Sequence, residues 1–206
     1  RDMSMPEEIN RIVTDAISDL LFTTDAPAVE NLRREGVADE KIHFVGNTMI
    51  DTLRQQIGRA REVPLPDGLK PGEYAVLTLH RPANVDSADR LSLILRAVNA
   101  IAERIPVVFP VHPRTAPRLK EMELHPRIRT VEPMSYVPFL GLVARCCMVL
   151  TDSGGIQEET TVLGVPCLTM RPNTERPITC EIGTNVLVGT DPQRILQEAN
   201  SILDGH

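Results

Sequence analysis

The sequence predicts an α/β fold in which a parallel, Rossmann-like sheet has helices on both faces. Two observations support this prediction. From residue 73 onward, short apolar runs of strand length alternate with longer segments of helical periodicity, and the connections between them are mostly short. Because right-handed crossovers return each strand to the same sheet, this alternation indicates parallel strands covered by helices.

The first 62 residues predict three helices and one strand. Apolar residues at helical spacing predict a helix over residues 6–21, which begins with a proline whose missing N–H costs nothing there. A short apolar stretch precedes Asp25, a candidate N-cap for a second helix that ends at Gly36. Residues 42–45 are expected to form a strand, followed by a third helix through residues 50–57.

Residues 63–72 contain three prolines and two glycines, so they can neither continue a helix nor lie in a central strand. We therefore place a linker here, between a first part, residues 1–62, and a C-terminal domain, residues 73–206. In that domain the pattern predicts strands over residues 74–79, 106–111, 128–131, 148–151, 166–170 and 185–188, and helices over residues 87–102, 116–122, 137–144, 155–163 and 192–203. Ligands of such sheets bind outside the carboxyl ends of the strands.

The composition excludes several classes of partner. The net charge of −6 disfavours nucleic acid and anionic membranes, which attract basic surfaces. The longest apolar runs have the length of a strand, far below the roughly 20 residues that cross a bilayer.

The four cysteines have no metal-ligand spacing, so we expect reduced core residues and no metal. The sequence shows no secretory signal pattern, which favours the cytoplasm.

The most informative motif is Thr-Asp-Ser-Gly-Gly-Ile-Gln-Glu-Glu at residues 151–159, which leaves a predicted strand and opens a helix. Gly154 and Gly155 let a ligand approach the backbone, and the first N–H groups of the helix can bind a phosphate. The Ser153 hydroxyl would be a further donor, and Glu159 could accept hydrogen bonds from ribose hydroxyls. The alternative is that the aspartate and serine only cap the helix and the glycines only form a tight turn.

A histidine and an arginine follow each of two predicted strands. His80 and Arg81 come directly after the first strand of the C-terminal domain, and His112 and Arg114 come after the next. An imidazole in this position can move protons or bind a phosphate near neutral pH. A single histidine is more often structural, but the two similar endings lie at one edge of the sheet and favour a function.

Three further residues are candidates on their own. Phe139 belongs to a chain with only four Phe, two Tyr and no Trp, and it is expected either to stack on a base or to pack in the core. Arg176, in a loop after a strand, has the fork of donors that matches a diphosphate. Glu7 begins a helix, where a carboxylate is favourable whether or not it has a further role.

Taken together, these stretches resemble the non-hydrolysing UDP-N-acetylglucosamine 2-epimerases, which have the two-domain GT-B architecture. The resemblance rests on five motifs in the order of the family: Pro-Glu-Glu-Ile-Asn-Arg (residues 6–11), Gly-Asn-Thr-Met-Ile-Asp (46–51), His-Arg-Pro-Ala-Asn (80–84), Asp-Ser-Gly-Gly-Ile-Gln-Glu-Glu (152–159) and Thr-Glu-Arg-Pro (174–177). The resemblance implies a fragment that lacks most of the N-terminal domain and the extreme C-terminus, so residues 1–62 would be the tail of that first Rossmann-like domain.

The family eliminates UDP to leave 2-acetamidoglucal and adds it back with inversion at C2, so that UDP-N-acetylglucosamine and UDP-N-acetylmannosamine interconvert. No cofactor or metal is needed. The resemblance implies catalytic roles for Glu7, as a proton-handling acid, and for His80, near the departing diphosphate. It implies UDP binding by Phe139 on the uracil side, by Ser153, Gly154 and Gly155 at a phosphate, by Glu159 at the ribose and by Arg176 at the diphosphate. Arg81 and His112 resemble residues of a second, activating UDP-N-acetylglucosamine site.

The resemblance further implies a homodimer in the intact protein and a place in cell-surface polysaccharide biosynthesis. Two alternatives stay open. A GT-B glycosyltransferase would use the same nucleotide site for a UDP-sugar donor, although the motif at residues 6–11 disfavours it. A non-catalytic module would bind the UDP-sugar without deuterium uptake at C2.

Overall fold

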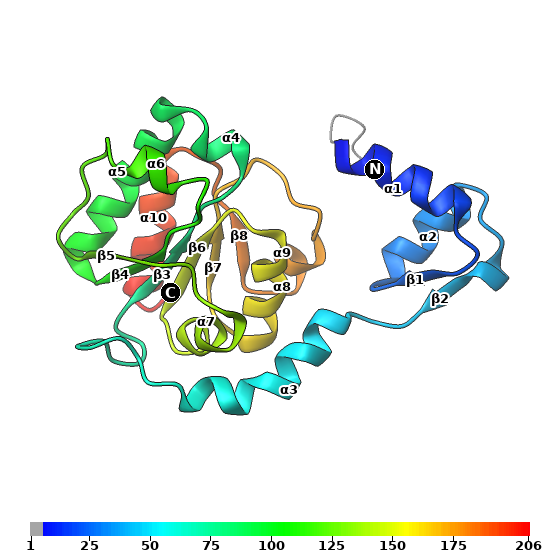
Figure 1. Cartoon of the computed structure of the whole chain (residues 1–206), viewed down its shortest axis with the longest axis horizontal. Coiled ribbons are helices and arrows are strands. Elements are labelled where there is room, and N and C mark those ends of the chain that lie inside the picture. The colour runs from blue at the N-terminus through cyan, green and yellow to red at the C-terminus, as the bar shows by residue number, and fades with distance from the viewer. Residues whose placement is uncertain (1–5) are drawn as a thin grey trace. The chain divides into compact units, whose positions relative to one another are not determined.

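The computed structural model describes residues 6–206, which pack into two units (Figure 1). The smaller unit ends at Thr52, and the larger unit comprises Leu53–His206. The helix α3 (Thr48–Glu62) begins in the smaller unit and continues into the larger one. The division into residues 1–62, 63–72 and 73–206 that the composition suggests stays a prediction.

The smaller unit contains two helices and a short parallel sheet. Its elements are α1 (Pro6–Ile17), β1 (Leu21–Thr23), α2 (Ala26–Arg34), the 3-10 turn η1 (Asp39–Lys41) and β2 (Ile42–Phe44). The carboxylate of Asp25 accepts a hydrogen bond of 2.8 Å from the backbone N–H of Ala28, which confirms it as the N-cap of α2. The helix α1 ends earlier than predicted, because the chain turns after Ile17 so that Leu21 can pair with Ile42 in the sheet.

The larger unit contains a six-stranded sheet in the order β5-β4-β3-β6-β7-β8, in which every neighbouring pair is parallel. Its strands are β3 (Ala75–Thr78), β4 (Val107–Pro110), β5 (Ile128–Val131), β6 (Met148–Thr151), β7 (Cys167–Thr169) and β8 (Asn185–Leu187). Its helices, beyond the end of α3, are α4 (Pro82–Val85), α5 (Ala88–Arg104), α6 (Ala116–Leu119), α7 (Tyr136–Val143), α8 (Gly154–Leu163), α9 (Ile178–Glu181) and α10 (Pro192–Leu203). The predicted α/β class with a parallel sheet is confirmed.

Both faces of this sheet are covered. Along β3, Ala75 and Leu77 pack into an apolar cluster with α5 and α10, whereas Tyr74 and Val76 pack into a second cluster with residues of α7. Side chains of a strand alternate between its faces, so this division places helices on both sides of the sheet. Figure 1 shows α5 and α10 on one side of the strands and α7 and α8 on the other.

The second half of α3 packs against α7 within the larger unit. Leu53 and Ala60 form a buried cluster with Leu140 of α7. The two helices approach closely at Gly141, where an added Cβ atom would collide with the carbonyl oxygen of Ala60. A glycine is therefore required at this helix contact.

The four cysteines are free thiols, as expected. Cys146 and Cys167 are buried, but Cys180 is exposed, so the expectation that all four fill the core was wrong for this residue. Its place on the short helix α9, outside the sheet, explains the exposure. Among residues 6–206, no helix is both long and apolar enough to cross a bilayer.

Candidate functional site

The carboxyl ends of β3 and β6 meet where the strand order reverses. β3 pairs with β4 on one side and with β6 on the other. Connections leave in opposite directions at such a point, which is where α/β sheets bind ligands. Two of the predicted motifs lie here, because residues 80–84 follow β3 and residues 152–159 follow β6. The fold thus brings together segments about 70 residues apart in the sequence.

The carboxylate of Asp152 connects these two segments. It is fully buried and accepts hydrogen bonds from the backbone N–H groups of His80 (3.1 Å) and Arg81 (2.9 Å). The side-chain amide of Asn84 donates to the same carboxylate (3.2 Å) and to the carbonyl oxygen of Met170 (3.0 Å). The first turn after β3 is therefore fixed by one acid at the end of β6.

The same carboxylate orients the imidazole of His80. Nδ1 of His80 lies 2.9 Å from Oδ1 of Asp152, and the His80 side chain is 38% exposed. Burial alone would raise the pKa of Asp152, but the hydrogen bonds from His80 and from the backbone of Arg81 outweigh it and lower the pKa below its ordinary value. An ionised Asp152 can only accept, so Nδ1 of His80 has to be the donor. The acceptor nitrogen of a neutral His80 is then Nε2.

His112 lies next to His80. The two ring centroids are 5.7 Å apart, with the planes tilted by 44°. Thr115 ties the loop after β4 to this place, because its buried hydroxyl donates to the carbonyl oxygen of Leu79 (2.6 Å). Arg114 turns away from the pair and forms two hydrogen bonds with the carboxylate of Asp86 (2.9 and 2.7 Å).

The helix α8 begins just after Asp152, the residue that contacts His80. Ser153 is its N-cap residue, yet the serine hydroxyl makes no capping hydrogen bond, and its backbone N–H donates to the hydroxyl of Thr151 (3.0 Å). The carboxylate of Asp152 is occupied by the segment after β3. Neither side chain therefore caps α8, so the part of the alternative that makes these residues helix caps was wrong, whereas the part in which the glycines only form a tight turn stays open. Gly154 and Gly155 form the first turn, whose N–H groups are typical of anion sites.

Glu159 lies in the same helix and is buried, with 6% of its surface exposed. Burial is the main reason that its pKa is raised, and the nearby Glu158 adds to this effect. A hydrogen bond of 3.0 Å from the hydroxyl of Tyr136 acts in the opposite direction. Burial together with Glu159 raises the pKa of Tyr136 to about 12. Tyr136 is therefore a donor that holds the Glu159 carboxylate in place.

Phe139 lies one turn after Tyr136 on α7 and packs against the apolar cluster around Val76. The structure thus places Phe139 in core packing, while Tyr136 is the more exposed aromatic residue of this helix, at 37%. The role of Phe139 on the uracil side stays a prediction.

The loop after β7 is anchored on α8 by a buried amide. The side chain of Gln157 donates to the carbonyl oxygen of Ser153 (3.1 Å) and accepts hydrogen bonds from Thr174 (2.6 Å) and Asn185 (3.1 Å). Gln157 is fully buried. The segment that contains Arg176 is therefore held against the beginning of α8 rather than projecting freely.

Two arginines of this loop are paired with acids. Nε of Arg176 lies 3.1 Å from a carboxylate oxygen of Glu158. Glu175 accepts hydrogen bonds from Arg171 (2.8 Å) on one oxygen and from Arg81 (3.1 Å) on the other. These contacts join the loop after β7 to the loop after β3.

The structure brings most of the predicted site residues to one edge of the larger sheet. His80, Arg81 and His112 lie after β3 and β4. Ser153, Gly154 and Gly155 lie at the start of α8, Glu159 lies further along this helix, and Arg176 lies after β7. Glu7 belongs to α1 of the smaller unit, and its side chain lies outside the described part of the chain. The role of Glu7 stays a prediction.

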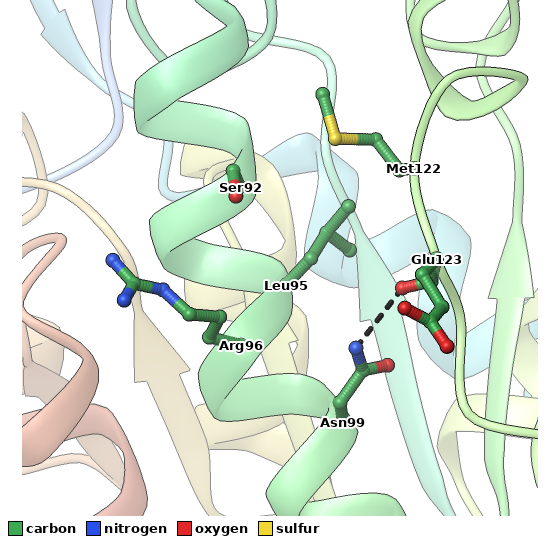
Figure 2. Close-up of a pocket in the computed structure, with 6 residues that line it drawn as sticks. All are labelled: Ser92, Leu95, Arg96, Asn99, Met122 and Glu123. Atoms are coloured by element: carbon green, nitrogen blue, oxygen red, sulfur yellow. Dashed lines mark hydrogen bonds between the residues drawn. The ribbon is translucent and has the colours of Figure 1, made fainter.

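A cavity of about 210 Å³ lies elsewhere, beside α5 (Figure 2). It is lined by Ser92, Leu95, Arg96, Asn99, Met122 and Glu123. Figure 2 shows the side-chain amide of Asn99 donating to the backbone carbonyl oxygen of Glu123. None of the predicted site residues lines this cavity. Across residues 6–206, no cluster of three or more metal-ligating side chains is present.

Comparison with known proteins identifies the family of the chain. A family profile described as UDP-N-acetylglucosamine 2-epimerase matches residues 1–206. The chain belongs to this family. It is 40% identical over 215 residues to the UDP-N-acetylglucosamine 2-epimerase of Methanococcus maripaludis, covering 98% of this chain and 59% of that protein. It is also 40% identical over 208 residues to the UDP-2,3-diacetamido-2,3-dideoxy-D-glucuronate 2-epimerase of Pseudomonas aeruginosa, covering 98% of this chain and 57% of that protein.

Among solved structures, the chain is similar to the Methanocaldococcus jannaschii UDP-GlcNAc 2-epimerase in complex with UDP-GlcNAc and UDP. The TM-score is 0.87 at 40% identity, with 100% of this chain and 60% of that chain covered. This chain of the epimerase family thus spans about three fifths of the length of the relatives it matches.

Four residues of this candidate site were not predicted to contribute to it. Asp152 and Asn84 lay inside quoted motifs, but their shared hydrogen bonds appear only when β3 and β6 are adjacent. Glu175 also lay inside a quoted motif, at residues 174–177, but received no role, and Arg171 was not singled out, although both follow a strand. The signal that could have found them was their position, because Arg171 comes two residues after the end of β7, and functional residues of parallel sheets gather after the strands.

Proposed function

We propose that this chain is the UDP-binding half of an epimerase that inverts C2 of a UDP-N-acetylhexosamine. The single observation that carries the proposal is the contact between Asp152 and His80 at the strand reversal, next to the uncapped N-terminus of α8. This arrangement combines an oriented imidazole with an anion site. In the named relatives the ligand is a UDP-sugar, which offers both a diphosphate and a proton to be moved.

The nucleotide would lie across the start of α8. Its diphosphate would accept hydrogen bonds from the backbone of Gly154 and Gly155 and from the Ser153 hydroxyl, which no capping bond occupies. Glu159, held by Tyr136, would accept hydrogen bonds from the ribose hydroxyls. Arg176 would contribute positive charge, for which it has to exchange its contact with Glu158.

The reaction proposed is elimination and readdition without hydrolysis. A base removes the proton from C2, the bond between C1 and the UDP oxygen breaks, and 2-acetamidoglucal with a C1–C2 double bond remains. UDP then attacks C1 while a proton is delivered to the opposite face of C2. His80 would move a proton at the departing diphosphate, with Nδ1 held by Asp152, and Glu7 would be one of the acids that handle the C2 proton.

Further parts of the proposal rest on the family resemblance. They are a homodimer, a cytoplasmic location, a role in cell-surface polysaccharide biosynthesis, and a second, activating site with Arg81 and His112. The sugar is the point at which the named relatives differ, since one acts on a diacetamido-glucuronate derivative. The UDP moiety and inversion at C2 are common to their names.

Calorimetric titration with UDP tests the nucleotide half directly. We expect saturable binding near one site per chain, weakened by Glu159→Ala and by Ser153→Ala. Glu103→Ala on the exposed surface of α5 is the matched control and should bind UDP like the unchanged chain. The absence of UDP binding by a folded chain would refute the proposal for this half.

Catalysis is tested on a full-length protein of the family that carries this segment. Incubation with UDP-N-acetylglucosamine in D₂O should give the mannosamine epimer with deuterium at C2. Sugar transfer to an added acceptor without C2 exchange would instead identify a glycosyltransferase, and binding without exchange would identify a binding module.

A further inference from the structure

Glu175 lies where the proposed diphosphate site begins. A Cβ atom added at Gly154 would be 3.7 Å from Oε2 of Glu175, so this carboxylate lies against the first turn of α8. Glu175 itself is mostly buried, with 19% of its side chain exposed. The N-terminal turn of α8 thus already has a negatively charged group close to it.

Two guanidinium groups hold this carboxylate. Arg171, with a side chain only 9% exposed, donates to Oε2 at 2.8 Å, and Arg81 donates to Oε1 at 3.1 Å. Burial raises the pKa of Glu175, but the hydrogen bond and charge of Arg171, with the charge of Arg81, outweigh it and lower the pKa. Glu175 is therefore an ionised group near neutral pH.

The buried charge of Arg171 explains why the chain has a carboxylate at Glu175. A buried guanidinium such as Arg171 is costly without an anionic partner, so the protein without ligand needs Glu175. A diphosphate is also an anion and suits the same donors, because arginine binds phosphate and carboxylate in the same geometry. With both anions present, the carboxylate and a phosphate would repel each other across the first turn of α8.

We propose that Glu175 is an internal competitor of the diphosphate, which occupies the edge of the anion site and gives up Arg81 and Arg171 when a nucleotide binds. This inference rests on the proposed function for the identity of the nucleotide. The carboxylate lowers the affinity for diphosphates and determines how readily UDP leaves. The affinity for free UDP matters in an elimination mechanism, because UDP cleaved from C1 has to stay in the site until it returns to C1.

Removal of the charged contacts of Glu175 should raise the affinity for UDP, whereas a loss of contacts usually lowers affinity. Glu175→Gln removes the negative charge and retains the shape, so UDP should bind more tightly, by about threefold to tenfold, as expected for a partly buried ion pair. Affinity for uridine, which has no phosphate, should not change. Glu181→Gln on α9 makes the same change of charge at an exposed position of the following helix and should leave UDP affinity unchanged.

Calorimetry with UDP, uridine and inorganic pyrophosphate on the unchanged chain, Glu175→Gln and Glu181→Gln tests the inference. The inference is supported if Glu175→Gln, but not Glu181→Gln, binds UDP and pyrophosphate more tightly than the unchanged chain.

Equal or weaker binding by Glu175→Gln overturns the inference and makes Glu175 a structural partner of the arginines. An equal gain in affinity for uridine overturns it as well. Pyrophosphate does not require uridine recognition, so a gain with pyrophosphate but no UDP binding would refute the nucleotide assignment and leave the role of Glu175 standing. No gain with either anion would overturn the role of Glu175.

Discussion

Nδ1 of His80 lies 2.9 Å from Oδ1 of Asp152, and the backbone N–H groups of His80 and Arg81 donate to the same carboxylate. One buried acid therefore fixes both the position of the turn after β3 and the orientation of its imidazole. The conformation of His80 depends on a strand that is distant in the sequence.

Replacement of Asp152 by Asn should change the tautomer of neutral His80. The amide oxygen of Asn can still accept from the backbone, but its NH₂ group presents a donor toward Nδ1, which then has to accept. Long-range ¹H–¹⁵N NMR at about pH 8, where histidine is mostly neutral, should show the proton on Nδ1 in the unchanged chain and on Nε2 in the variant. Asp86→Asn, at an exposed acid that pairs with Arg114, is the control and should keep the original tautomer. An unchanged tautomer in Asp152→Asn would contradict the orienting role.

Glu159→Gln should stabilise the fold and weaken UDP binding. The pKa of Glu159 is raised in the folded chain, chiefly by burial, so the folded state prefers the protonated form and loses stability as the pH rises through that pKa. A glutamine at this position has a neutral amide that does not ionise, so the variant does not lose this stability at pH values above the ordinary pKa of a carboxyl group. Chemical denaturation should therefore show a higher free energy of unfolding for the variant at pH 7 and a smaller difference at about pH 4, near the pKa of an unfolded glutamate. A variant less stable at pH 7 would contradict the assigned direction.

Gly154→Ala should reduce UDP affinity without a loss of stability. The backbone of Gly154 is helical, and an added methyl group would meet only Glu175, at an ordinary van der Waals distance of 3.7 Å. The same methyl group would cover the N–H groups that a phosphate has to reach, so affinity should fall about tenfold or more, which corresponds to about 1.4 kcal/mol. Calorimetry with UDP and thermal unfolding check the two parts. If UDP affinity is retained, the phosphate does not bind at this turn.

Gly141→Ala should destabilise the larger unit, by about 2 to 4 kcal/mol, because the new Cβ atom would collide with the backbone of Ala60 and force α3 and α7 apart. Gly58→Ala on α3 is the matched control, since nothing lies within 4 Å of its added Cβ atom. That substitution should stabilise the chain by about 0.5 to 1 kcal/mol, because alanine favours the helix. Urea denaturation of both variants measures the difference. Equal stability of the two variants would show that the helix contact at Gly141 is not close.

Much of the fold follows from local patterns. The strands over residues 128–131 and 148–151 were predicted with the bounds that the structure has, because β-branched or apolar residues flanked by turn segments define them. The helices α4 and α9 were missed, and α6 was predicted to run on to residue 122, because four residues are too few for a helical period to define a helix.

The site was predictable only in part, for a physical reason. Residues such as His80 and Ser153 can be identified as candidates because each follows a strand, and the parallel sheet brings them together. The partners that orient them are different, because Asp152 reaches His80 and Glu175 reaches Arg81 across 72 and 94 positions of the sequence. No local pattern encodes which acid pairs with which donor.

The strand order has a consequence for how the larger unit folds. β3 lies in the middle of the sheet, and its partner β6 begins at Met148, with Thr78 and Thr151 paired 73 positions apart. Contacts of such separation form slowly, because a long loop has to close before the pairing stabilises it. On the ribosome, β3 and β4 would be complete well before β6 emerges, with the apolar edge of β3 still unpaired. The pairing of β3 with β6 at the strand reversal is therefore a step at which a nascent chain is exposed to wrong pairing and aggregation.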